Sequence, residues 1–226
     1  MEVNDVARLL HQAAASGDGR QVAEILASGV SPDLRESGVG RTALDRAVWN
    51  NHPDVVRVLL AAGADPHAEM GEFRETTALR YAAPRGMREV ARHLLDAGAH
   101  PDGRVGADQY TPLILAAAQG DVEMVELLLD RGACPNLTVQ PQLIEGVAEN
   151  LGISTKVSPL SSAAGSGHLE TVRLLLVRGA RPDDDVLESV VKGMVRAETV
   201  PSVHRRGSLR EFALIRELVE QARKLP

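Results

Sequence analysis

The sequence is poor in cysteine and has no long run of apolar residues. Cys134 is the only cysteine, which excludes an intramolecular disulfide and a metal site built from several thiolates. No stretch reaches the roughly 20 apolar residues that a membrane-spanning helix needs. The N-terminal MEVND is acidic, and no secretory signal follows it. We therefore expect a chain that does not enter a membrane and that resides in a reducing cytoplasm.

Basic residues are also in deficit. The chain has 25 Lys and Arg against 31 Asp and Glu, which gives a net charge of −6 and a pI near 5.7. A nucleic-acid binder needs a basic stripe that follows the phosphates, and the short cluster His204-Arg205-Arg206 does not supply one. We predict no nucleic-acid partner. Only Lys156, Lys192 and Lys224 are lysines, and this preference for arginine, with the many alanines and glycines, indicates a GC-rich bacterial source.

Aromatic residues make up only 2% of the chain. A core must therefore be built from Leu, Val, Ile and Ala, and the hydrophobic content of 44% is sufficient for a folded protein. Because Ala and Leu favour helix, the composition points to an all-α fold.

Internal self-similarity is the most informative feature that is present. Five segments end in two apolar residues, two further residues and a glycine; these glycines are Gly29, Gly63, Gly98, Gly132 and Gly179. Twelve residues before each glycine lies a second marker: Gly17, Asn51, Gly86, Gly120 and Gly167. Four of these five markers are glycine, and asparagine is the residue that next best tolerates a left-handed backbone.

Each unit of this pattern predicts two short helices. The first helix carries a pair of small residues, such as Ala116-Ala117, which allows neighbouring helices to approach closely. The second carries apolar residues at helical spacing, such as Val125, Leu128 and Leu129, and ends at a glycine suited to a C-cap. Since neither helix could bury its apolar stripe alone, stability must come from stacking of successive units.

The fourth unit closely resembles an ankyrin repeat, through Thr111-Pro112-Leu113, Ala116-Ala117, Gly120, Leu128-Leu129 and Gly132-Ala133. The resemblance implies one all-α ankyrin-repeat solenoid over residues 1–226. It implies five helix-turn-helix repeats, at about 5–36, 37–70, 71–105, 106–136 and 154–183. A degenerate C-terminal capping helix pair follows at 184–226, in which Ser208 is the predicted N-cap and the stripe is Phe212, Ala213, Ile215, Leu218 and Val219.

One departure from the family pattern concerns a histidine. The histidine usual after the first-helix leucine is present only as His11; the other repeats carry Asp45, Arg80, Ile114 and Ser161 there. We expect the buried hydrogen bond of that histidine to be absent or remade in those four repeats.

An insertion at 137–157 separates the fourth and fifth repeats. Pro141 to Leu151 is amphipathic and predicts a short helix. Two interpretations stay open: a loop that packs on its own apolar residues, or a lid or wall beside the groove of the repeats.

No catalytic, metal or cofactor motif is recognisable, so we expect a non-enzyme without cofactors. Ser161-Ser162 near His168 is a weak nucleophile-and-base candidate, because the repeat pattern gives these residues packing positions. Cys134 is expected to be an exposed thiol without a function.

The residues after the small pair of each first helix, and the hairpin tips, face the groove in the ankyrin pattern. Those of types that dominate binding hot spots, or adjoin them, are the predicted site: Arg41, Trp49, Asn50, Phe73, Arg74, Arg85, Tyr110 and Gln119. Tyr81, by contrast, is expected to pack inward.

We therefore predict a monomeric binding module that holds a protein partner in the groove, with a regulatory role. The alternative is an enzyme or small-molecule binder. Its pocket would be formed by the groove and the 137–157 insertion, with Trp49, Tyr110 and a carboxylate such as Asp108 or Glu145.

Overall fold

The structure is a computed structural model that describes residues 3–36, 40–70, 76–103, 110–140, 156–199 and 207–224. Its contacts divide the chain into two compact units, Met1–Arg104 (unit 1) and Val105–Pro226 (unit 2), and each is described on its own.

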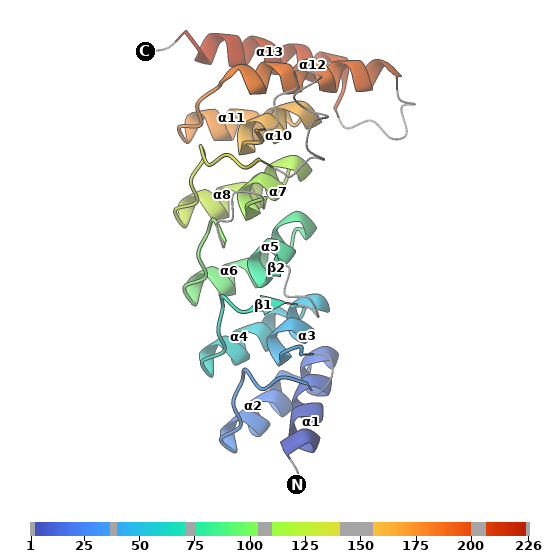
Figure 1. The fold of residues 1–226 in the computed structure, drawn as a ribbon, viewed down its shortest axis with the longest axis vertical. Helices are drawn as coiled ribbons and strands as arrows, with labels where there is room; N and C mark the ends of the chain where they lie inside the picture. The colour runs from blue at the N-terminus through green and yellow to red at the C-terminus, as the bar shows by residue number, and fades with distance from the viewer. Residues whose placement is uncertain are drawn as a thin grey trace. The chain divides into compact units, whose positions relative to one another are not determined.

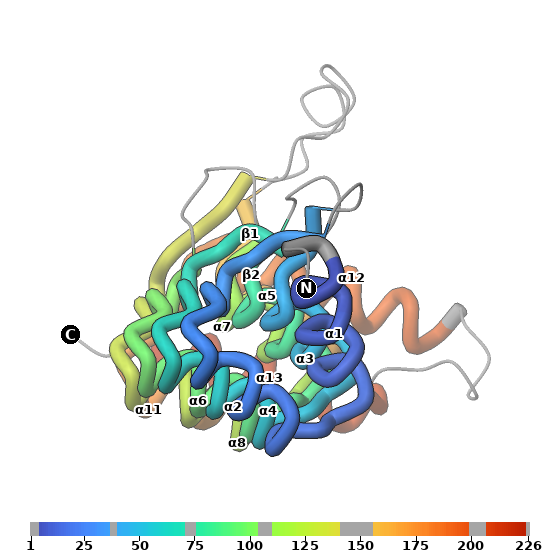
Figure 2. Tube along the Cα trace, turned by 90° about the horizontal axis from the view of Figure 1, so that it is seen from below, coloured from blue at the N-terminus to red at the C-terminus, as the bar shows by residue number. Residues whose placement is uncertain are grey.

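The described part of unit 1 contains three helix pairs, which are successive in sequence (Figure 1). The pairs are α1 (Val3–Ser16) with α2 (Gly19–Ala27), α3 (Ala43–Trp49) with α4 (Pro53–Ala61), and α5 (Ala78–Ala82), extended by the 3-10 helix η1 (Ala83–Arg85), with α6 (Arg88–Asp96). The first helices α1, α3 and α5 contact one another in order, and α2, α4 and α6 form a second layer (Figure 2). The three pairs therefore stack as repeats.

A short hairpin interrupts the helices of unit 1. Strands β1 (Glu69–Met70) and β2 (Thr76–Thr77) pair antiparallel, with Glu69 opposite Thr77 and Met70 opposite Thr76. The hairpin leads directly into α5, whose N-cap is Thr77, so it sets where the first helix of the third repeat begins.

Unit 2 repeats the same arrangement with α7 (Pro112–Gln119), α8 (Val122–Asp130), α10 (Pro159–Ser166), α11 (Leu169–Val177), α12 (Asp184–Thr199) and α13 (Leu209–Ala222). The first helices α7, α10 and α12 contact in order, and α8, α11 and α13 pack beside them. The predicted capping pair is thus α12 and α13. Ser208 does cap α13, in a capping box with Glu211. Phe212, Ile215 and Val219 of the predicted stripe are buried, whereas Ala213 is exposed because it lies on the outer side of the helix.

The insertion is described only at its two ends. Val139 and Val157 form an isolated antiparallel bridge, with N–H···O distances of 2.9 and 2.8 Å. The helix predicted over 141–151 lies outside the described residues.

The core is built from the small and branched residues that the repeat pattern marked. The alanines of the small pairs in all five repeats are fully buried, as are the stripe residues Val125, Leu128, Val172 and Leu175. The all-α ankyrin solenoid of five repeats with a C-terminal helix pair is confirmed. None of the described helices is both long and apolar enough to cross a membrane.

The mid-repeat markers have the left-handed backbone that the sequence predicted. Gly17 has φ +81° and Gly120 φ +74°, and Asn51, at φ +55°, is the non-glycine residue with positive φ in the described part of the chain. A Cβ on Gly17 would lie 2.8 Å from the ring of His52, and one on Gly120 would lie 2.5 Å from the ring of His168. These glycines are therefore needed for the next repeat to pack as well as for the turn.

The missing histidines are replaced by capping boxes in two of the four repeats. Thr42 and Asp45 bond reciprocally at the start of α3, and Ser158 and Ser161 do the same at the start of α10. In each case the residue in the histidine's place bonds within its own helix start, and all four side chains are buried. A local hydrogen-bonded pair thus satisfies the backbone at these two positions.

Candidate functional site

Four side chains of unit 1 stack on one another beside the first helices. Arg41 precedes the N-cap of α3, Trp49 is the last residue of α3, Tyr81 lies in α5, and Arg85 is the last residue of η1. We refer to these four residues as the stacked cluster. Three of them belong to the predicted site, and the fourth, Tyr81, does not.

The stacked cluster has two rings in contact with each other and one cation over each of them. The guanidinium carbon of Arg41 lies 4.6 Å from the centroid of the Trp49 ring, and that of Arg85 lies 3.7 Å from the centroid of Tyr81. The two rings meet at a centroid distance of 5.7 Å with an interplanar angle of 52°. Both distances from a cation to a ring are within the range of cation–π attraction, and the rings are in favourable tilted contact.

The cluster is fixed in place yet remains accessible. Arg85 also donates from Nη1 to the carbonyl oxygen of Tyr81 at 2.9 Å. Trp49, the only tryptophan of the chain, is nevertheless 44% exposed. A large side chain that is ordered and exposed at the same time is the kind that contributes most to binding.

Tyr81 is half-buried and meets both Trp49 and Arg85, so the prediction that it packs inward is wrong. It lies directly before the small pair Ala82-Ala83. The sequence does contain a signal for this position: the equivalent residues of other repeats include Gln12, Arg46 and Ser162, which are polar. A position that accepts polar residues in several repeats is one that faces away from the core.

The arginines in this part of unit 1 differ in whether they form ion pairs. Arg46 donates to Glu36 at 2.5 Å, and this hydrogen bond is the main reason why the pKa of Glu36 is below its ordinary value. Arg41 and Arg85, in contrast, form no ion pair within the part of the chain that the structure describes, and Nε of Arg41 is buried without a hydrogen-bond partner there. The rings of Trp49 and Tyr81 therefore cover one face of each guanidinium group, and no described carboxylate forms an ion pair with either arginine.

The other predicted residues are not members of the stacked cluster. Asn50 is the C-cap of α3, and its side chain donates back to the carbonyl oxygen of Arg46 at 2.8 Å. Gln119 is exposed at the end of α7 in unit 2. Phe73 and Arg74 lie outside the described residues.

Tyr110 lies in unit 2, at the edge of a hollow of about 360 Å³. We refer to it as the unit 2 hollow; its lining residues are Tyr110, Ile114, Leu115, Ala118, Lys156, Val157, Ser161, Ser162, Gly165, Ser166, Ser189, Lys192 and Arg196. The positions after the small pairs of α7 and α10, which the sequence assigned to the groove, contribute Ala118, Gly165 and Ser166. Lys156 and Val157 are the described residues at the end of the insertion.

The described lining of the unit 2 hollow contains no acidic residue. Asp108 and Glu145, the carboxylates of the alternative enzyme hypothesis, lie outside the described residues. Ser161 is engaged in its capping box with Ser158, and His168 contacts the carbonyl oxygen of Ala118 through Nε2 at 3.2 Å. Both side chains therefore have structural partners. Among the described residues, no group of three or more His, Cys, Asp or Glu side chains is placed to hold a metal ion. Cys134 is exposed, as predicted.

Three ankyrin-repeat family profiles match the chain: "Ankyrin repeats (many copies)" over residues 10–67, "Ankyrin repeats (3 copies)" over 67–139 and "Ankyrin repeat" over 156–185. The fold is also similar to the crystal structure of an ankyrin repeat domain from Acinetobacter baumannii, with a TM-score of 0.70 and 28% identity over 94% of this chain and 96% of that one.

Two curated relatives are similar in sequence to this chain over about half of its length. An ankyrin repeat-containing protein of Treponema pallidum is 38% identical over 50% of this chain and 37% of its own length. The mouse B-cell lymphoma 3 protein homolog is 31% identical over 55% of this chain and 27% of its own length. The chain thus spans about a quarter to a third of these relatives. The repeated helix pairs, the three profiles and these relatives together show that the chain belongs to the family of ankyrin-repeat proteins.

Proposed function

We propose that the chain is a binding module for a protein partner, which it contacts through the stacked cluster of unit 1. Binding of proteins is the general role of ankyrin repeats. The observation that carries the proposal is the ordered, partly exposed stack of Arg41, Trp49, Tyr81 and Arg85. A regulatory role in a bacterial cytoplasm, and a monomeric state, are part of the same proposal.

The physical case rests on order that exists before binding. Each cation–π contact holds a long arginine side chain that would otherwise lose rotamer freedom on association, so less entropy is lost when a partner arrives. Trp49 offers apolar area, and the guanidinium groups beside it offer hydrogen-bond donors. The complementary partner surface is therefore an apolar side chain with a carboxylate next to it.

The test uses the only tryptophan as both target and reporter. Partners retained from a native extract by the wild-type chain are identified by mass spectrometry, and the affinity of each is then measured by calorimetry. We expect Trp49→Ala to weaken binding of the true partner by roughly 2 kcal/mol or more, as truncation of a hot-spot residue does. The wild-type complex should also show a changed Trp49 emission spectrum.

The matched control is Val177→Ala. Val177 is an exposed apolar residue, 83% exposed, on α11 of unit 2. If the wild type and folded Trp49→Ala bind every retained protein with equal affinity, the stacked cluster is not part of the binding surface.

A small-molecule binder is the second candidate, and the unit 2 hollow is the observation that favours it. Its volume of about 360 Å³ is at the lower end of ligand-site sizes. The described lining supplies cations and hydroxyl groups, which suit binding of a ligand better than proton transfer.

A further inference from the structure

Positive charge is concentrated in the unit 2 hollow although the chain as a whole is acidic. The net charge of the chain is −6, yet the hollow is lined by Lys156, Lys192 and Arg196 and by no described carboxylate. Two of the three lysines of the chain are among these residues. Low-dielectric walls on one side of such a hollow strengthen its attraction for anions.

The floor of the hollow adds hydrogen-bond donors from α10. Ser162 and Ser166 of α10 are half-buried, and their hydroxyls form no hydrogen bond with the described residues. Gly165 between them faces α12, where an added Cβ would lie 3.2 Å from Cβ of Ser189, so its missing side chain lets α12 pack against α10. The floor therefore offers open hydroxyls.

An acidic side chain of α12 lies beside the hollow. Glu188 pairs with Lys192 at 2.7 Å on α12, at i,i+4 spacing. Both side chains are more than a third exposed, so this pair contributes little energy and can be exchanged for an ion pair with a ligand. Arg196, one turn further along α12, is exposed and forms no ion pair within the described part of the chain.

We propose that the unit 2 hollow binds the carboxylate side chains of an acidic peptide segment. This rests on the proposed function, since the segment belongs to a protein partner. The lining is drawn from three successive first helices, α7, α10 and α12, and a strip of that kind matches an extended chain better than a compact molecule. Lys192 and Arg196 meet the carboxylates from α12, Lys156 meets them from the end of the insertion, and the hydroxyls of α10 bond the peptide between them.

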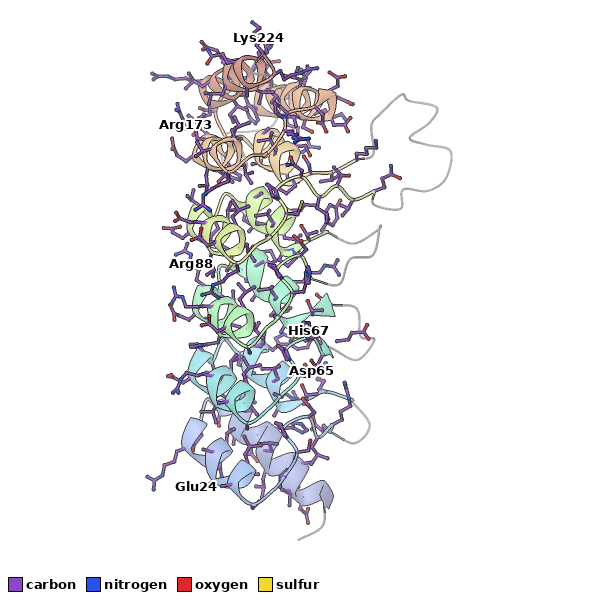
Figure 3. The ribbon with its side chains drawn as sticks, turned by 90° about the vertical axis from the view of Figure 1, so that its left-hand side faces the viewer. Glu24, Asp65, His67, Arg88, Arg173 and Lys224 are labelled. Carbon is purple, nitrogen blue, oxygen red and sulfur yellow. The ribbon has the colours of Figure 1, made fainter. Side chains whose placement is uncertain are left out.

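The scarcity of lysine allows a direct test. The full chain is treated with an amine-reactive acetylating reagent at low ionic strength, with and without a short oligoglutamate peptide, and each lysine is followed by mass spectrometry. We expect the peptide to slow acetylation of Lys156 and Lys192 several-fold and to leave Lys224 unchanged. Lys224 is exposed after the end of α13 and serves as the internal reference (Figure 3). Equal protection of all three lysines, or none, overturns the proposal.

Affinity for the labelled oligoglutamate peptide is measured by fluorescence anisotropy on matched variants. Lys192→Gln/Arg196→Gln should weaken binding about tenfold or more, because it removes two ion pairs with the ligand. Arg173→Gln/Arg216→Gln removes the same charge from unit 2 outside the hollow and should bind like the wild type; Arg173 lies on α11 (Figure 3). An equal loss of affinity in both variants would show that binding depends on the net charge of the chain and not on the hollow, which overturns the proposal.

Two further measurements distinguish this proposal from binding at the stacked cluster and from binding of phosphate. Trp49→Ala should retain oligoglutamate binding, so that failure of the stacked cluster as a partner site and failure of the hollow are distinguished. Inorganic phosphate should compete weakly. If phosphate binds and the oligoglutamate peptide does not, the hollow is a site for phosphate and the assignment to a peptide is overturned.

Discussion

Histidines at three positions connect residues far apart in sequence. His52 and His168 direct Nε2 at the carbonyl oxygens of Ala15 and Ala118 in the preceding repeats, at 3.0 and 3.2 Å. His11 donates from Nε2 to Leu34 at 2.9 Å and is 2% exposed. Each bond pairs a carbonyl oxygen of one segment with a ring from another, so these residues stabilise the stack.

His11 makes the stability of unit 1 depend on pH. Burial lowers its pKa below the ordinary value of 6.5; it outweighs the backbone hydrogen bond to Leu34 and the carboxylates of Glu36 and Asp45, which act in the opposite direction, while Arg46 reinforces the lowering. Below pH about 6.5 the unfolded chain therefore binds more protons than the folded one, so the free energy of unfolding decreases as the pH falls from there toward the folded pKa.

We expect His11→Gln to reduce this pH-dependent loss, as measured by urea unfolding at a series of pH values from neutral to mildly acidic. His67→Gln, at an exposed position in the same unit, is the matched control and should keep the wild-type slope. A slope that is the same in His11→Gln and in the wild type would show that His11 does not titrate differently on folding.

At the scale of helices, the C-terminal pair depends on a close contact between three helices. Gly193 of α12 lies where an added Cβ would be 2.3 Å from Cε1 of Phe212 on α13 and 2.7 Å from the carbonyl oxygen of Gly165 on α10. Phe212 is itself 1% exposed. A side chain at this position would have to displace both a buried ring and a backbone, which overpacking makes costly.

Gly193→Ala should therefore lower the free energy of unfolding of unit 2 by about 2 kcal/mol, even though alanine is the better helix former by about 1 kcal/mol. The measurement is urea denaturation followed by far-ultraviolet circular dichroism. Gly19→Ala is the control, because a Cβ there, at the start of α2, would be 3.9 Å from its nearest neighbour, Val55. A variant as stable as the wild type would mean that α13 can shift at little cost.

The helices were predictable from sequence because their determinants are local. The turns at the glycine markers and the N-cap at Ser208 are set within a few residues of their own position, and each is found as predicted. The polar residues at equivalent positions indicate that Tyr81 faces away from the core, but its contact with Trp49 of the preceding repeat could not be predicted in this way, and neither could the grouping of the lysines in the unit 2 hollow. Lys156 lies 36 residues before Lys192, and no periodic pattern links them. Contacts between repeats depend on stacking geometry, which the pattern of one repeat does not contain.

At the scale of the whole molecule, stability should be local, because in a repeat protein each repeat contacts mainly its neighbours. The chain has two compact units, and its only tryptophan, Trp49, is in unit 1, whereas Gly193 is in unit 2. Tryptophan fluorescence therefore reports unfolding of unit 1 alone, and circular dichroism reports both units. The two probes can be compared on a single variant.

We expect Gly193→Ala to separate the two probes in urea unfolding. The circular dichroism transition should broaden and begin at lower urea, because unit 2 is destabilised, while the midpoint seen by Trp49 fluorescence stays near that of the wild type. The physical reason is that the added Cβ strains α10, α12 and α13, none of which belongs to unit 1. If both probes shift together and remain superimposable, the chain unfolds as one cooperative body, and the coupling between its units exceeds the strain introduced.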